Sequence, residues 1–406
     1  MCKALAFDAR TLWVLNVGDL KPAEIGMDYF LRLARDGSSA TQPEYLRQWA
    51  ERNFSAEHSA AIAEILGEYY LLNNAVKPEH LTYANFTAAE ADERLAKFST
   101  LMAKTDKLYA AMPEKFRDAF FELVAYPVRG SALANERILC AARSRALAAK
   151  NDPAANVFAD RAEQAHAKIK VETEFYNAQL AGGKWRYMMS DTPGNMKAGR
   201  PPEVARVTNG VAATTEKVSL SSTGAKNTGA FAERGGFVSM EAMHFTHNVA
   251  RGGAAWQVVE GLGRTGRALT IFPANAASIT NVTDLAANSP CLEYDFTCTT
   301  IGAVTATVYC VPVHKLYPGR GARFAVAVDD AAPKIVDIES EEYSKVWGGN
   351  VLRAAALGIA ANQVAAAGKH TFKLWMVDPG VPVDKIVLNF GREEKSYFGP
   401  PETRLK

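Results

Sequence analysis

The hydrophobic pattern of the chain changes its period once, and this change restricts the fold more than any other feature. In residues 89–109, one helix face carries the positions Ala91, Leu95, Phe98, Met102, Thr105 and Tyr109. Later, strand-like alternation places on one face Phe372, Leu374 and Met376, and then Ile386, Leu388 and Phe390. The chain therefore combines a helical part with a later β part, and its 406 residues are enough for two cores.

Residues 23–190 are predicted to form an α-helical bundle. The helical spacing recurs at Ile62, Ile65, Leu66 and Tyr69. Thr87 and Glu90 have the spacing of a capping box, and Pro113 followed by Glu114 suits a first helical turn. Several long helices in succession, with little strand signal between them, favour packing as a bundle.

Residues 191–229 are predicted to be a linker, because they are rich in glycine, proline, serine and threonine. Residues 230–406 contain short alternating segments separated by turn residues, which predicts an antiparallel, jelly-roll-like β-sandwich. Within this sandwich, only Leu352–Val364 has the composition of an inserted helix. The expected fold class is thus multidomain α plus β.

The opening segment fits neither part. Leu12–Val17 is an almost continuous apolar run that ends at Gly18-Asp19, which is typical of a strand buried on both faces of a parallel sheet or barrel. Such an orphan barrel strand needs parallel partners outside this sequence. We therefore expect residues 1–22 to be the remnant of a (β/α) barrel, and the chain to be truncated with that barrel cut off almost entirely.

The composition excludes several classes of protein. The 46 basic and 44 acidic residues are well mixed and give a net charge of +2, so no nucleic acid and no membrane is expected as a partner. The five cysteines are spread and contain no Cys-x-x-Cys pair, which favours buried or incidental thiols. The sequence shows no signal peptide and no window approaching the ~20 apolar residues of a membrane span.

Three patterns suggest chemistry that their surroundings do not support. Gly261–Gly266 matches the dinucleotide pattern Gly-x-Gly-x-x-Gly, but a strand-like run follows it, so a glycine-rich hairpin is favoured over a nucleotide site. His244 and His247 would project to opposite faces of a strand, which disfavours a metal site. The pairs Asp329-Asp330 and Glu341-Glu342 are adjacent in sequence, whereas glycosidase carboxyls lie about 5 to 9 Å apart. We expect no cofactor and no metal.

Segments spread over almost the whole chain resemble one family. They are residues 13–22, 118–124, 126–128, 180–186, 188–189, 236–242, 261–266, 375–381 and 397–402. In this order they are similar to the C-terminal half of glycoside hydrolase family 115, the xylan α-1,2-glucuronidases. The resemblance implies an enzyme built from an N-terminal α/β domain, a catalytic barrel, a helical bundle and a C-terminal sandwich.

The resemblance also implies an activity and partners. Family members remove glucuronic or 4-O-methyl-glucuronic acid from xylan, so glucuronoxylan or aldouronic oligosaccharides are the expected substrates. The family's acid and base lie in the barrel, so the catalytic residues are unknown here and the chain alone is expected to be inactive. The other expected partners are the missing N-terminal and barrel domains and a second copy in a homodimer. The full-length enzyme is expected to be secreted or periplasmic.

Two residues carry over from the resemblance as substrate-binding candidates. Asn16 resembles an active-site asparagine at the end of a late barrel strand, where its amide would donate to and accept from sugar hydroxyls or the uronate. Lys21 follows close behind and is a candidate partner for the uronate carboxylate, with a structural role as its alternative.

A non-catalytic function is the alternative hypothesis. The same bundle and sandwich would then form a carbohydrate-binding or scaffold protein. Aromatic side chains stack on sugar rings, and the sandwich offers as stacking surfaces Trp256, Trp347, Trp375 and Tyr397.

Overall fold

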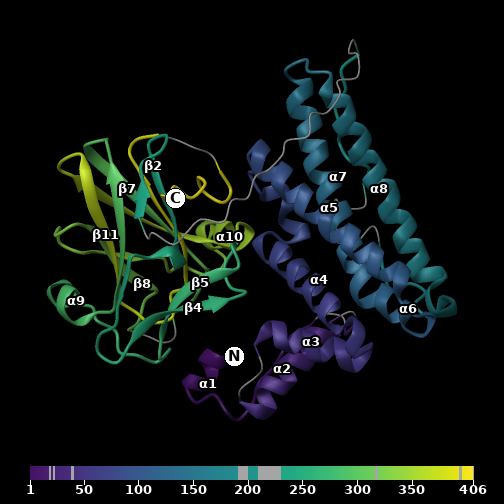
Figure 1. Cartoon of the computed structure of the whole chain (residues 1–406), viewed down its shortest axis with the longest axis horizontal. Coiled ribbons are helices and arrows are strands. Elements are labelled where there is room, and N and C mark those ends of the chain that lie inside the picture. Colours follow the sequence, from purple (N-terminus) through teal and green to yellow (C-terminus); the bar gives the residue numbers. More distant parts are fainter. Residues whose placement is uncertain are drawn as a thin grey trace. The chain divides into compact units, whose positions relative to one another are not determined.

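The computed structural model describes residues 1–17, 20–21, 23–37, 41–190, 200–208, 230–315, 319–392 and 396–405. The chain divides into two compact units, one of residues 14–221 and one of residues 1–13 with 222–406. The first unit is helical and the second contains two β-sheets (Figure 1). The predicted fold class of multidomain α plus β is confirmed.

Helices form nearly all of the first unit's regular structure. They are α2 (Glu24–Asp36), α3 (Gln42–Asn53), α4 (Ala56–Ala75), α5 (Ala88–Ala111), α6 (Glu114–Phe120), α7 (Tyr126–Ala148) and α8 (Ala154–Ala178). A π-helical turn, Phe121–Ala125, joins α6 to α7. The predicted capping box is present, since the Glu90 amide donates to Thr87 and the Thr87 amide donates to the Glu90 carboxylate at 2.7 Å. No helix among the described residues is long and apolar enough to cross a membrane.

The predicted apolar run near the N-terminus forms no strand in this chain. Residues 12–17 belong to no helix or strand, and the preceding residues form only a short helix, α1 (Cys2–Ala6). Leu12 and Val14 are 78% and 80% exposed. An extended segment without a neighbouring strand has no ladder to join, so its apolar side chains remain exposed.

The described part of the predicted linker runs along the bundle. The Asn156 side chain accepts from the Val207 amide at 2.9 Å and donates to the Val207 carbonyl at 3.0 Å. Arg206 forms ion pairs with Asp160 and Glu163 on α8. Residues 200–208 are therefore anchored on α8, while the remainder of the predicted linker lies outside the described residues.

Two sheets face each other across the core of the second unit. One sheet has the order β1-β6-β11-β8-β9, with β3 paired to β6, and the other has the order β10-β7-β12-β5-β4, with β2 paired to β12. The strands are β1 (Ala230–Ala232), β2 (Phe237–Glu241), β3 (His247–Val249), β4 (Ala255–Glu260), β5 (Arg267–Phe272), β6 (Cys291–Cys298), β7 (Gly302–Cys310), β8 (Arg323–Val328), β9 (Lys334–Asp337), β10 (Ala356–Val364), β11 (Gly368–Met376) and β12 (Val383–Asn389). Nearly all neighbours are antiparallel, as predicted for a sandwich, although β1 runs parallel to β6.

The alternating pattern of the strands explains the sandwich core. Buried side chains from both sheets form one cluster that includes Tyr294, Phe296, Val308, Phe324, Phe372 and Ile386. On the outer face of the first sheet, Trp375 is also buried, because it packs with Leu285 of α9 (Val282–Asn288). Burial of this area is the main stabilising contribution to the sandwich.

The expected helix at Leu352–Val364 is wrong. Helix α10 (Lys345–Leu352) ends where it was expected to begin, and β10 then pairs with β7 along its whole length, from Ala356 opposite Cys310 to Val364 opposite Gly302. The many alanines favour a helix locally, but cross-strand pairing and burial of alternate residues outweigh that propensity. Gly358 fits because a Cβ there would meet the ring of Phe324.

Candidate functional site

Asn16, the first residue predicted to bind substrate, belongs to the helical unit, lies in the irregular stretch of residues 12–17 and is exposed. Its neighbours Leu15 and Val17 line a groove of about 610 Å³. The other wall residues include Ile25, Tyr69, Tyr70, Tyr126 and Met189. This groove is mainly apolar, so it fits apolar side chains better than a sugar.

Lys21, the second predicted residue, is engaged within the helical unit. Its ammonium forms an ion pair with Glu24, lies 3.8 Å from Glu122 Oε1 and lies 5.5 Å from the centre of the Trp185 ring. Burial acts to lower the pKa of Lys21, but the hydrogen bond to Glu24 and the charge of Glu122 raise this pKa overall. A uronate would therefore compete with two carboxylates for Lys21.

Glu122 is a candidate that the sequence analysis missed. It lies on the π-helical turn Phe121–Ala125, and its side chain is only 8% exposed. Burial raises the pKa of Glu122, and the charge of Lys21 opposes this shift. A π-turn often marks a functional position. The available signal was a single carboxylate inside the otherwise apolar run Phe120–Ala125.

The Lys21 cluster, which consists of Lys21, Glu24, Glu122 and Trp185, combines two carboxyl groups with one cation. Two carboxyls with different pKa values are the usual arrangement for glycosidase acid and base chemistry. Here, however, Lys21 lies against both of them. The arrangement therefore fits a structural ion cluster better than a catalytic pair. No group of three metal-ligating side chains occurs among the described residues.

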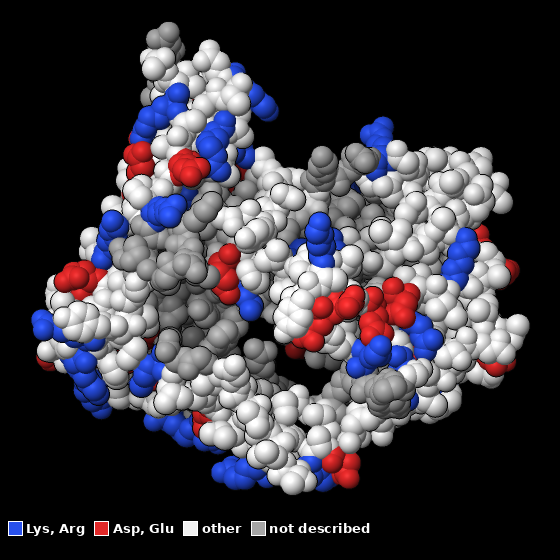
Figure 2. All heavy atoms as spheres, turned by 180° about the vertical axis from the view of Figure 1, so that it is seen from behind, with Lys and Arg blue, Asp and Glu red and all other residues white. Residues whose placement is uncertain are grey.

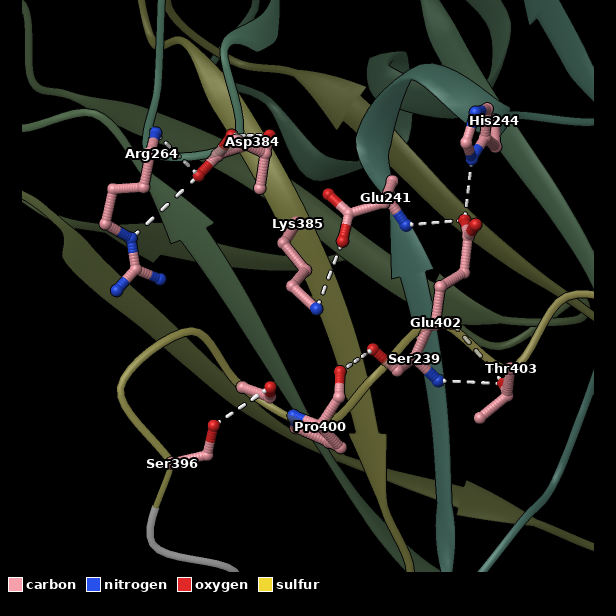
Figure 3. A network of polar contacts seen from close by, with 12 residues as sticks. Ser239, Glu241, His244, Arg264, Asp384, Lys385, Ser396, Pro400, Glu402 and Thr403 are labelled. Carbon is pink, nitrogen blue, oxygen red and sulfur yellow. Dashed lines mark hydrogen bonds and ion pairs between the residues drawn. The ribbon is translucent and has the colours of Figure 1, made fainter. Parts of the chain in front are cut away.

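The sandwich contains a second charged cluster, around Arg264 and Asp384, whose side chains are 2% and 3% exposed (Figure 3). The rings of Tyr309, Tyr397 and Phe398 lie 5.0 to 5.6 Å from the Arg264 guanidinium. Arg264 also donates to the Tyr397 carbonyl at 2.6 Å, and its amide donates to Asp384 at 3.1 Å. This arginine therefore connects the β4–β5 loop with the C-terminal segment.

Other buried polar groups fasten the same C-terminal segment to β2 and to His244, which follows β2. Ser239 donates to the Pro400 carbonyl at 2.7 Å, and the Ser239 amide donates to Thr403 (Figure 3). Glu402 lies 2.7 Å from His244 Nδ1 and accepts from the Glu241 amide. Burial acts to raise the pKa of Glu402, but these hydrogen bonds lower it overall.

The glycine motif at Gly261–Gly266 is a hairpin loop between β4 and β5, as favoured over a nucleotide site. The Gly261 amide donates to the Gly266 carbonyl at 2.8 Å. Gly263 has a φ of 80°, and a Cβ there would meet Asp384 Oδ1 at 2.5 Å. No helix follows the loop, so the pyrophosphate-binding arrangement is absent from this described region.

The predicted histidine and aromatic candidates do not come together as a site. His244 pairs with Glu402, whereas His247 is exposed on β3. Three of the proposed stacking residues are buried, with exposures of 3%, 4% and 7% for Trp256, Trp375 and Tyr397. Trp347 is partly exposed on α10, and its ring centre lies 5.1 Å from that of Tyr343.

Two family models match the sequence. The model of glycosyl hydrolase family 115 matches residues 1–80, and the model of the family 115 C-terminal domain matches residues 230–402. Together they match more than half of the chain, in the expected order. The chain belongs to glycosyl hydrolase family 115. The family 115 matches include Asn16 and Lys21, while Glu122 lies outside both of them.

One solved structure supports the family 115 fold. A family GH115 4-O-methyl-α-glucuronidase with specificity for decorated arabinogalactans covers 96% of this chain at 24% sequence identity, with a TM-score of 0.72. The chain spans 47% of that enzyme. A second match is the carbohydrate-binding module CsCBM6-3 from Clostridium stercorarium, in complex with cellobiose. The match spans 40% of this chain and 99% of the module at 15% identity, with a TM-score of only 0.25. No curated protein matches the chain.

Proposed function

We propose that the chain serves as the C-terminal part of a glycoside hydrolase that removes glucuronic or 4-O-methyl-glucuronic acid side chains from a polysaccharide. The observation that carries this proposal is the ordered match to both family 115 models. The likeness to a 4-O-methyl-α-glucuronidase over almost the whole chain supports it. The non-catalytic alternative is not favoured, because three of its four stacking residues are buried.

Within such an enzyme, the Asn16 side chain orients the sugar. The rest of the chain has a structural role. An exposed amide donates to and accepts from hydroxyl or carboxylate oxygens, but it cannot protonate a leaving group. Cleavage of the glycosidic bond needs an acid and a second carboxylate. Glu24 and Glu122 share the single cation of Lys21 in an ion cluster, so we assign acid and base chemistry to other parts of the family 115 fold.

The polysaccharide is the open choice within this activity. Xylan is the substrate that the sequence resemblance implies, with glucuronoxylan or aldouronic oligosaccharides as ligands. Decorated arabinogalactan is the second candidate, because the structurally similar glucuronidase is specific for it. With either polysaccharide as substrate, the enzyme would act outside the cytoplasm, as a secreted or periplasmic protein. On the face in Figure 2, acidic and basic side chains of the described residues are interspersed, which favours neither nucleic acid nor an anionic membrane as partner.

The test measures free uronic acid from glucuronoxylan and from decorated arabinogalactan. One sample contains the chain alone, and the other contains the chain joined to the α/β and barrel domains of the family. We expect release only by the joined protein, and the preferred polymer identifies the substrate. Release by the chain alone would show that its own carboxyls are catalytic, and then Glu122→Gln should abolish it. No release from either polymer by the joined protein would contradict the proposed activity.

A further inference from the structure

A groove of about 500 Å³ with a mixed polar and apolar lining lies on the sandwich, at the junction of the β1–β2 turn, the end of β12 and the C-terminal segment. It is lined by Arg234, Gly235, Phe237, Arg392 and residues 400–403. We propose that this groove is a non-catalytic binding site for a uronic acid unit of a polysaccharide, with Arg234 and Arg392 binding the carboxylate. The identification of the ligand as a uronic acid rests on the proposed function. The expectation that the ligand is an anion rests only on the two arginines that line the groove.

Arg234 is held on a rigid turn. Its amide donates to the Phe237 carbonyl at 2.8 Å, and the Phe237 amide donates to the Arg234 carbonyl at 3.1 Å. The two residues between them, Gly235 and Gly236, have φ values of 63° and 86°, which glycine adopts without strain. The backbone at Arg234 is therefore fixed before a ligand arrives.

Arg392 is fixed beside this turn. The Asn389 side chain accepts from the Arg392 amide at 2.9 Å and donates to the Arg392 carbonyl at 2.6 Å. The Arg392 stem lies on Gly236, where a Cβ would come within 3.0 Å of its Cγ and Cδ. The Phe390 amide also donates to the Gly236 carbonyl at 3.0 Å, so the two arginine-bearing turns are hydrogen-bonded to each other.

The neighbouring acidic side chains are occupied elsewhere. Glu233 accepts from the amides and hydroxyls of Thr299 and Thr300, at 2.6 to 3.2 Å. Glu402 is bound by His244 and the Glu241 amide. Among the described residues, Arg234 and Arg392 form no ion pair, and both are exposed. The groove therefore has two cations that no described carboxylate neutralises.

The lining of the groove favours a sugar acid over a simple anion. Guanidinium groups recognise carboxylates through paired hydrogen bonds. Pro401, which is exposed, supplies apolar surface beside them, and this surface suits the C–H face of a pyranose ring. Because phosphate shares only the charge of a uronate, it should bind more weakly than glucuronate.

The experiment measures the migration of the 406-residue chain by affinity electrophoresis in glucuronoxylan and in the same polymer after reduction of its carboxyl groups. The test variants are Arg234→Gln and Arg392→Gln. The matched control is Arg267→Gln, an exposed sandwich arginine that already pairs with Glu260. We expect retardation only by the acidic polymer, a loss of affinity of roughly tenfold for each test variant, and no change for the control. Free glucuronate should compete better than inorganic phosphate.

Three results would overturn the site: no retardation of the wild-type chain, equal retardation by the reduced polymer, or unchanged affinity of both test variants. Equal competition by phosphate would overturn the sugar assignment. Unfolding midpoints of the variants, compared with that of the wild type, separate lost binding from lost folding. Binding and hydrolysis are measured separately, so uronate-dependent binding by the chain, together with no uronic acid release by the joined protein, contradicts the proposed function and leaves this site standing.

Discussion

The Lys21 cluster of the helical unit and the Arg264–Asp384 cluster of the sandwich both hold charges away from water, but to different degrees. Arg264 and Asp384 are almost completely enclosed, whereas the Lys21 side chain is 37% exposed beside a buried Glu122. A closed cluster fixes the structure, because its charges cannot return to water without unfolding. An open cluster responds to pH and to partners that compete for its cation.

The largest effect is expected from Arg264→Ala. This change leaves Asp384 buried without its cation and empties the space between Tyr309, Tyr397 and Phe398. The free energy of unfolding of the sandwich should fall by about 3 to 5 kcal/mol. Hydrogen exchange of β5 and β12 amides in denaturant measures it. In the exposed control, Arg267→Ala should cost less than about 1 kcal/mol.

Alanine substitutions at two glycines separate the cost of backbone strain from the cost of a clash with the Arg264–Asp384 cluster. Gly263 and Gly253 have similar φ values, 80° and 75°, but only at Gly263 would a Cβ meet Asp384. Both alanine variants carry strain of about 1 kcal/mol or more, and Gly263→Ala should cost in addition the displacement of Asp384. Unfolding curves of the two variants should therefore differ, and equal losses would mean that Asp384 shifts freely.

The Lys21 cluster should make the stability of the helical unit depend on pH, with a defined sign. Burial raises the pKa of Glu122 above its ordinary value of 4.5 in the folded state. Its contribution to stability is complete below 4.5 and is lost as the pH rises through the raised pKa. Glu122→Gln should remove this loss from the helical unit. Guanidinium unfolding at a series of pH values checks it.

The sandwich carboxylate Glu402 should give a pH dependence of stability with the opposite sign. Its pKa is lowered in the folded state, so its contribution is present above 4.5 and is lost as the pH falls through the lowered value. Glu402→Gln should therefore weaken the acid sensitivity of the sandwich. A Glu402→Gln variant with unchanged acid sensitivity would show that its hydrogen bonds to His244 and Glu241 do not stabilise the anion.

The smallest effect on stability is expected at the N-terminal segment. Leu12 and Val14 are exposed, so replacing both with serine removes little buried area. The unfolding midpoint should stay within experimental error, and solubility should improve. A clear loss of stability would show that both side chains are packed within this chain.

Local patterns predicted the elements that local interactions determine. The capping box at Thr87 and the hairpin at Gly261–Gly266 involve residues that are close in sequence. Strand β10 was missed, because its alanines resemble a helix until they pair with β7, about fifty residues earlier. The Lys21 cluster joins residues a hundred positions apart, and Arg264 contacts Tyr397 across 133 positions. Such contacts depend on the fold and leave no local pattern.

The most direct test of the account is uronic acid release by the chain joined to the α/β and barrel domains of the family, before and after Asn16→Ala. Asn16 is exposed, so the variant should fold with an unchanged unfolding midpoint. Loss of its hydrogen bonds to the sugar should lower turnover by about ten- to a hundredfold. An Asn16→Ala enzyme that releases uronic acid at the wild-type rate would contradict the placement of the substrate beside this segment.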